Sequence, residues 1–271
     1  MLRYQRFRRL IVILPLFSGA FWTKDARAQA LMTSARQMPE GSSKLIVYYQ
    51  GSAGQDLNFA LNGSGSAVSK STSVVYASQS GGDVKGEGDG GGLFLKWVIQ
   101  PWEQIQYYAL AGAGKYALHV PSATVTNTLS GERIGWTYGA GMRAVLHPDT
   151  PVMPAIALDA AMARSRYFFS RLTQGSLGGK SIDHRLDLYQ YQLAFEASHR
   201  FADWEPYGGV RWQRIQTHLS DSADGSAAGG IEDGVSPFLG VRYQWTSRES
   251  LVAEAAFVKG VSFGCGLEIK F

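Results

Sequence analysis

The chain has 271 residues, of which 45% are hydrophobic and 18% charged, with 32 glycines and a formal net charge of +4. The basic excess lies at the N-terminus, because residues 1–30 hold six of the 26 Lys and Arg residues and one of the 22 Asp and Glu residues. The remainder, with 20 basic and 21 acidic residues, has no global attraction for nucleic acid, so no nucleic-acid partner is expected. The single cysteine, Cys265, excludes an intramolecular disulfide.

Residues 1–30 have the pattern of an export signal. Four arginines precede an apolar run, Leu10–Trp22, and small residues follow it. This run is shorter than the roughly 20 residues that cross a bilayer as a helix. We therefore predict a Sec-type signal peptide that is cleaved after Ala28 or Ala30.

The rest of the chain contains many segments in which apolar and polar residues alternate. Residues 132–147 are the clearest case, with Tyr138 and Met142 on one face and Thr137 and Arg143 on the other. Alternation with a period of two predicts strands with one apolar face. Short connections near 100–104, 147–151, 201–206 and 246–250 alternate with long polar ones at 80–92, 120–131, 171–184 and 219–234.

The last strand, residues 261–271, is apolar at every second position and ends in an aromatic residue; its apolar face includes Phe263, Leu267, Ile269 and Phe271. This strand resembles the terminal strand of Gram-negative outer-membrane β-barrels, in which it is part of the signal read by the barrel-assembly machinery. The resemblance, to the OmpA/OmpX/Opa-like group of small barrels, implies an all-β, antiparallel up-and-down transmembrane β-barrel over residues 73–271. It also implies the cell outer membrane as location, and as partners outer-membrane lipid, lipopolysaccharide and the assembly machinery.

The predicted number of strands is ten. Both ends of the barrel fall on the side of the short turns, which requires an even number, and nine strands follow Gly91. Eight or twelve strands remain open, because residues 44–50 and 73–79 are two strands or pieces of one. Residues 31–72 are therefore assigned to an N-terminal extension with a possible first strand.

Local patterns predict three details of the strands. A turn centred on Arg248 places Arg242 opposite Glu254. A three-residue loop, 258–260, joins the last two strands, with Gly260 in the left-handed conformation. A shift in the alternation near Gln213 predicts a β-bulge.

The polar face predicts a closed lumen. A ten-stranded barrel is narrow, and a buried charge without a partner costs several kcal/mol, so opposite charges in it are expected to pair. The predicted lumen charges include Lys96, Arg133, Arg143, Asp159, Glu196, Arg242 and Glu254, with Glu268 and Lys270 in the last strand. This favours a structural or surface-interaction role through extracellular loops, with a small-solute channel as the alternative.

A hydrolase at the extracellular rim is a second alternative. His119, His184 and His218 fall at the long-connection ends of strands, and Asp183 and Ser220 lie beside the last two. A histidine oriented by a carboxylate can activate water as a general base, which makes these residues weak catalytic candidates. No omptin motif matches residue by residue. The acidic glycine-rich segments do not match the calcium-loop pattern, so neither a metal nor a cofactor is expected.

Overall fold

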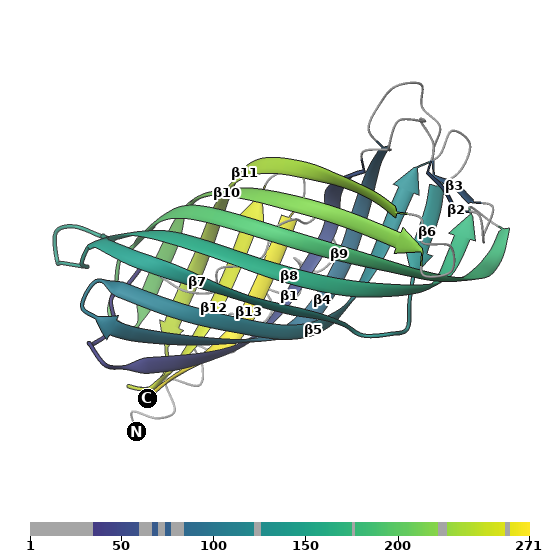
Figure 1. Cartoon of the computed structure of the whole chain (residues 1–271). Coiled ribbons are helices and arrows are strands. Elements are labelled where there is room, and N and C mark those ends of the chain that lie inside the picture. Colours follow the sequence, from purple (N-terminus) through teal and green to yellow (C-terminus); the bar gives the residue numbers. More distant parts are fainter. Residues whose placement is uncertain are drawn as a thin grey trace.

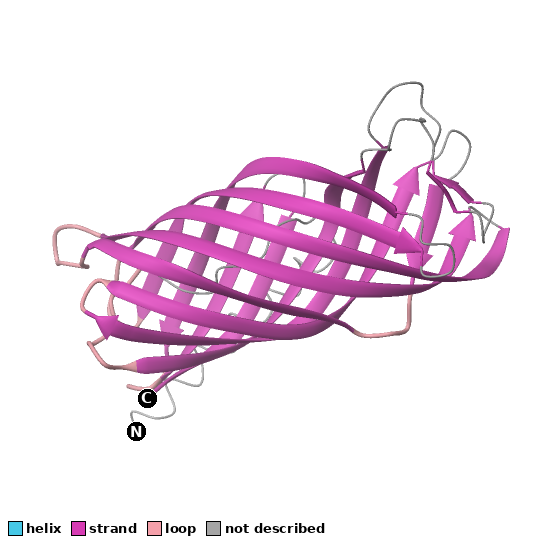
Figure 2. Cartoon of the chain, viewed as in Figure 1, coloured by secondary structure: helices cyan, strands magenta, loops and turns pink. Residues whose placement is uncertain are grey.

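The computed structural model describes residues 35–59, 67–69, 74–76, 84–121, 126–174, 177–221, 227–257 and 261–271. These residues form strands and turns (Figure 2), and none of them belongs to a helix long and apolar enough to cross a membrane. The strands are β1 Ser43–Phe59, β2 Ala67–Ser69, β3 Val74–Tyr76, β4 Val84–Trp102, β5 Ile105–Pro121, β6 Thr126–Ser130, β7 Gly135–His147, β8 Ala155–Gln174, β9 Leu177–Ser198, β10 Trp204–Asp221, β11 Ala227–Gln244, β12 Glu249–Phe257 and β13 Val261–Lys270.

Ten of these strands close into a ring, in the order β1, β4, β5, β7, β8, β9, β10, β11, β12, β13 and back to β1. Every pairing is antiparallel, and the strands wind obliquely around the barrel (Figure 1). The short strand β6 bridges β5 and β8 next to the start of β7. The predicted antiparallel barrel of ten strands is therefore confirmed.

The ring begins earlier than residue 73. Residues 44–50 belong to β1, which pairs with the last strand from Lys44 opposite Lys270 and with β4 on its other side. Val74–Tyr76 instead pairs with β2 in a separate two-stranded sheet. Of the two segments that left the strand count open, only the first contributes a strand to the ring.

The outside of the barrel carries a broad apolar band. Large apolar side chains on this face are exposed, among them Leu93, Trp97, Ile134, Met162, Leu193 and Leu239. Trp102, Phe201, Trp204 and Trp245 lie in or beside the short turns between strands, and Phe271 follows the last strand. The end of the barrel that holds the C-terminus (Figure 1) is here called the short-turn end. An apolar surface of this extent in a soluble monomer would be unusual, whereas a lipid-facing wall with aromatic residues at its edge requires it.

Toward the opposite, distal end the polarity of the two faces inverts. On β9, Tyr191 and Leu193 face outward, but further along the strand Leu188 and Leu186 are buried inside, with Asp187 on the outer face. The same change occurs on β10 between Trp212 and the buried residues Ile215 and Leu219. The barrel therefore continues beyond the apolar band as a wall that is polar outside and apolar inside.

The predicted bulge near Gln213 is wrong. β10 pairs in one continuous register with β11 from Trp204 to Ser220, and equally with β9. Even-numbered residues of β10, such as Trp212, face outward and odd-numbered residues face inward throughout. What resembled a shift of phase is the point where the apolar residues move from the outer face to the inner one.

Most of the predicted long polar connections are also strand. β4 begins at Val84, β8 reaches Gln174, β9 begins at Leu177 and β11 begins at Ala227. An apolar cluster fills the distal interior and holds these strand ends together; it consists of Leu57, Tyr116, Leu118, Val120, Leu129, Phe169, Leu172, Ile182, Leu186, Leu188, Ile215 and Leu219. The distal wall is rigid because it has a packed core of its own.

Glycines in the wall make room for aromatic rings that lie flat inside the barrel. A Cβ atom on Gly141 would come within 2.2 Å of the Tyr108 ring, and one on Gly240 within 2.2 Å of the Tyr207 ring. Both tyrosines are buried and pack across a neighbouring strand. The abundance of glycine and aromatic residues in the sequence follows from this packing.

Gly141→Ala is expected to destabilise the barrel by about 1 to 3 kcal/mol, because the new methyl group displaces the Tyr108 ring. The temperature at which the folded band converts to the unfolded band on semi-native gels should fall. Gly234→Ala is the control, since a Cβ there meets nothing within 4 Å. Equal transition temperatures for the two variants would contradict the packing argument.

Candidate functional site

The interior near the short-turn end is filled by balanced charges. Five cationic and five anionic side chains, each at most 4% exposed, face the lumen: Lys44, Lys96, Arg143, Arg211 and Arg242, with Asp159, Glu196, Glu205, Glu254 and Glu268. At this burial each ion must be compensated by a neighbour, so the geometry of the pairs decides whether the lumen is stable.

Arg143 is the centre of one group. Its Nε lies 3.2 Å from Oδ2 of Asp159, and its Nη2 lies 3.0 Å from Oε2 of Glu196. The Tyr108 hydroxyl donates a 2.7 Å hydrogen bond to the other oxygen of Asp159. The ammonium of Lys96 lies 3.7 Å from the centre of the Tyr108 ring, in cation–π geometry.

Arg242 is the centre of a second group. It donates at 3.0 Å to Glu268, at 2.8 Å to Glu205 and at 2.8 Å to the Ser250 hydroxyl. Lys44 donates to the second oxygen of Glu268 at 3.0 Å. This group draws side chains from β1, β10, β11, β12 and β13, so it crosses the closure between the first and last strands.

The predicted pairing of Arg242 with Glu254 is wrong. In the β11–β12 hairpin Arg242 lies opposite Val252, and Glu254 lies opposite Gly240, so the turn is centred one residue earlier than predicted. Glu254 instead binds Arg211 and accepts a 3.2 Å hydrogen bond from the Tyr207 hydroxyl. In the next hairpin Phe257 lies opposite Val261, the register that a loop at 258–260 requires; residues 258–260 themselves, Gly260 included, lie outside the described ranges.

Other sequence-predicted site residues fall in different places. Arg133 does not join the lumen, because it lies exposed in a bend before β7. Lys270 is part-exposed, 3.9 Å from Glu268. Phe263, Leu267 and Ile269 occupy the outward face of β13, and Phe271 is exposed just after the strand.

Three lumen charges were missed by the sequence analysis. Lys44 lies in the segment whose strand was left open, and Glu205 lies in a stretch read as a turn. Arg211 lies on β10, where the inverted polarity obscured which face is inner. Assigning every second residue of β10 to the inner face would have identified Arg211, since Tyr207 and Gln213 on the same face are also buried.

Residues 35–42 lie against the inner wall at the short-turn end. The Met38 amide donates a 2.7 Å hydrogen bond to the Gln100 side chain, and the Gln106 side chain donates to the Arg36 carbonyl at 3.2 Å. Arg36 lies 3.8 Å from Glu205 of the second ionic group, and Ala35 packs with alanines of β8. Through contacts to β4, β5, β8 and β10, this segment covers the short-turn mouth.

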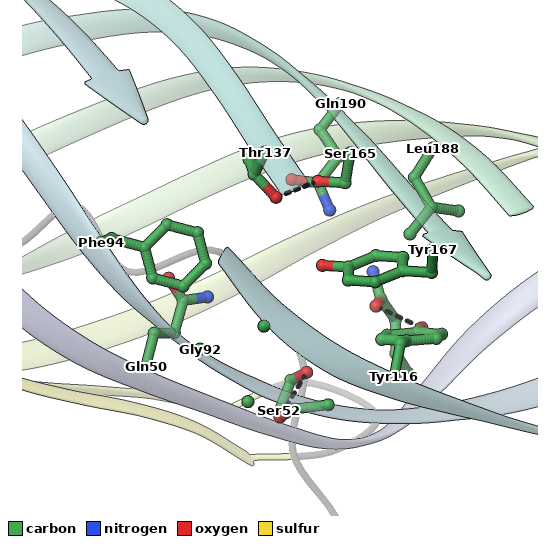
Figure 3. Close-up of a pocket in the computed structure, with 14 residues that line it drawn as sticks. Gln50, Ser52, Gly92, Phe94, Tyr116, Thr137, Ser165, Tyr167, Leu188 and Gln190 are labelled. Atoms are coloured by element: carbon green, nitrogen blue, oxygen red, sulfur yellow. Dashed lines mark hydrogen bonds between the residues drawn. The ribbon is translucent and has the colours of Figure 1, made fainter. Parts of the chain in front are cut away.

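A polar cavity lies between the ionic groups and the distal apolar cluster (Figure 3). Gln50, Ser52 and Gln190 line it, and the hydroxyls of Thr137 and Ser165 bond each other across 2.8 Å. The stacked rings of Tyr116 and Tyr167, with centroids 4.7 Å apart, form its distal side. Neutral polar walls of this kind suit ordered water.

No protein-family model matches the chain, and no curated protein sequence matches it. Solved structures do match. The outer-membrane protease OmpT from Escherichia coli aligns with a TM-score of 0.50 at 10% identity, over 89% of this chain and all of that one (100%). The translocator domain of the autotransporter NalP from Neisseria meningitidis aligns with a TM-score of 0.46 at 13% identity, over 86% of this chain and 90% of that one. The attachment invasion locus protein Ail of Yersinia pestis aligns at 0.36 and 10% identity, over 86% and 99%.

The chain has the fold of the small outer-membrane β-barrels. The similarity to these structures shows the fold alone, since the identities are 10% to 13%. In barrels of this architecture the short turns lie on the periplasmic side and the long connections on the extracellular side. By that rule the distal end of this barrel corresponds to the extracellular side, and the apolar band to the lipid-facing surface.

The weak catalytic candidates do not converge in this outer-membrane barrel. His184 is buried inside the wall, whereas His218 on the neighbouring strand is exposed on its outer face. Asp183 is exposed, and the Ser220 hydroxyl lies 3.5 Å from the Arg185 carbonyl that it bonds. Within the described ranges no group of three or more His, Cys, Asp and Glu residues could hold a metal ion.

His119 is the rim histidine with a carboxylate partner. Its Nε2 lies 3.1 Å from Asp89, and its Nδ1 lies 3.0 Å from the Thr128 hydroxyl. These residues sit side by side on β4, β5 and β6, and Asp89 also accepts a bond from the Gly54 amide at 2.6 Å. The arrangement ties the three strands and the β1 edge together at the extracellular end.

Arg211→Met is expected to cost about 3 to 5 kcal/mol, because it removes the guanidinium partner of the buried Glu254 carboxylate. The double variant Arg211→Met/Glu254→Gln should recover most of this loss, since neither charge remains. The measurement is urea unfolding of the folded protein in detergent micelles, with Arg248→Met in an exposed turn as control. A double variant as unstable as the single one would contradict the pairing.

Proposed function

We propose that this outer-membrane barrel is closed to solutes and acts structurally or by presenting its extracellular part to partners outside the cell. The observation that carries this proposal is the set of ten lumen charges, which are at most 4% exposed and equal in number for the two signs. A charge-lined pore would leave these groups in contact with water. Here the ten buried charges neutralise each other, and the part-exposed Arg36 and Lys270 add positive charge only at the short-turn mouth.

Three successive layers support a closed lumen. At the periplasmic mouth, residues 35–42 bind the inner wall through Gln100 and Gln106. The ionic groups around Arg143 and Arg242 follow, and the apolar cluster fills the extracellular interior. An ion that crossed the barrel would have to break paired charges and then lose its hydration shell among leucines.

The extracellular wall supports the surface role. Strands β8, β9, β10 and β11 extend past the lipid-facing band, and most of their outer side chains there are polar or charged, with the exposed Ile231 an exception. Along the sequence, residues 122–125, 175–176 and 222–226 connect the distal ends of described strands, and connecting segments of this kind commonly carry binding residues. In this proposal residues 1–30 direct export and the strand ending at Phe271 is read by the assembly machinery.

Purified folded protein in planar bilayers is expected to show no conductance steps. A variant without residues 35–42 is expected to stay silent as well, because the ionic groups and the apolar cluster remain. The conversion of the band on boiling, in semi-native gels, verifies that both proteins are folded. Regular steps from the intact protein would overturn the proposal, and steps from the shortened variant alone would move the seal to the N-terminal segment.

Replacing Ala123, Thr124, Val125, Ala223 and Asp224, the residues of the connections 122–125 and 222–226 that are not already Gly or Ser, by Gly and Ser is expected to reduce adherence of expressing cells to that of cells with an empty vector. Barrel stability should not change, because the strands and their core are intact. Replacing the periplasmic turn 246–248 in the same way is the control. Undiminished adherence of the first variant would contradict a surface role for these connections.

A further inference from the structure

Three arginines surround one carboxylate on the outer wall of the barrel. Asp187 of β9 lies 2.8 Å from Nε of Arg166, 3.4 Å from Nη2 of Arg164 and 3.3 Å from Nε of Arg185. The Asp187 side chain is 4% exposed because the arginines cover it, whereas the arginines themselves are 24% to 40% exposed. We call Arg164, Arg166 and Arg185 the arginine triad.

The triad lies where the lipid-facing band ends. On β8, Met162 is the last apolar outward residue before Arg164, and on β9 Tyr189 is the last before Asp187. The guanidinium of Arg164 lies 5.0 Å from the centre of the Tyr189 ring, and that of Arg166 lies 5.2 Å from the Trp136 ring. Aromatic rings beside guanidinium groups are the chemistry of the boundary between acyl chains and headgroups.

The charge of this cluster is unbalanced, unlike that of the lumen. Three guanidinium groups around one carboxylate leave a net charge of +2. Each guanidinium has five N–H donors, and one carboxylate can accept only about four hydrogen bonds, so most donors of the triad are left for another acceptor. Two oxygens of a tetrahedral phosphate group can accept bidentate hydrogen bonds from a guanidinium group, and the phosphate carries the compensating charge.

We propose that the arginine triad binds the phosphate group of a lipid in the outer leaflet of the outer membrane. The acyl chains of this lipid would lie along the apolar face of β7, β8 and β9, with its headgroup beside Trp136 and Tyr189. Asp187 holds the three guanidinium groups in place and limits their mutual repulsion before the lipid arrives. The proposal does not depend on whether the lumen conducts.

A fourth outward arginine, Arg214, forms a pair whose role is structural alone. Arg214 of β10 follows Trp212, whose ring lies 5.6 Å from the guanidinium carbon. Arg214 makes a bidentate pair with Asp233 at 2.8 Å for both bonds, so its charge is neutralised on the protein itself. Arg214 is therefore a matched control for an arginine at the edge of the band without excess charge.

The test measures binding of bisphosphorylated lipid A to the folded full-length protein in non-ionic detergent, by the rise in its heat-unfolding temperature. The same lipid A after removal of both phosphates should give no rise, and free inorganic phosphate should give little, because it lacks the acyl chains. Arg164→Gln/Arg166→Gln/Arg185→Gln should weaken binding at least about 30-fold, while Arg214→Gln changes it less than about 3-fold. Equal binding of the two lipids, or an equal effect of Arg214→Gln, would overturn the proposal.

Asp187→Asn keeps the test decisive if the triple variant folds poorly. Without the carboxylate the triad has a net charge of +3, so the variant should be less stable than the natural protein in lipid-free detergent. Bisphosphorylated lipid A should then raise its unfolding temperature by more than it raises that of the natural protein. If the lipid gives Asp187→Asn no larger rise, the triad is a structural cluster and the proposal fails.

Discussion

The pairing of charge inside a narrow lumen is the constraint on which the rest of this barrel depends. Ten buried ionic side chains could not coexist there unless nearby opposite charges offset them, as Asp159 and Glu196 offset Arg143. The strands on either side of the closure are joined by the same chemistry, because Lys44, Arg242 and Glu268 come from β1, β11 and β13. In the proposed closed barrel, the same charge pairs join the first and last strands and block the lumen.

The inversion of polarity along the strands explains how the barrel wall can continue beyond the lipid-facing band. Inside the bilayer the outer face must be apolar, so the polar residues turn inward and pair. Beyond the bilayer water surrounds the wall, and residues such as Leu186 and Leu219 move to the inside and form a core. One part of such a strand therefore has its apolar residues on the outer face, and the other part has them on the inner face. The residue at which the pattern changes marks the edge of the lipid-facing band.

The sequence predicted the ten-stranded barrel because alternation in the lipid-facing part is strong, and it placed Arg143, Asp159 and Glu196 on the inner face. It failed where the environment changes along one strand: Gln213 looked like a bulge, and residues 177–184 looked like a loop. The pairing of Arg211 with Glu254 depends on a hairpin register that shifted by one turn residue. Three-dimensional neighbours of this kind cannot be read from spacing along the chain.

Charge balance separates the inside of this protein from its outside. The ten buried lumen charges are equal in number for the two signs, and Asp233 neutralises Arg214. The stability of the barrel is a sufficient reason for these groups. The arginine triad is not cancelled, and an uncompensated charge of +2 beside hydrocarbon is costly unless an anion approaches it. The outer leaflet is the medium that surrounds the triad on its open side. On a closed barrel, arginines without a full counter-charge on the outer wall indicate where the protein binds a molecule from its surroundings.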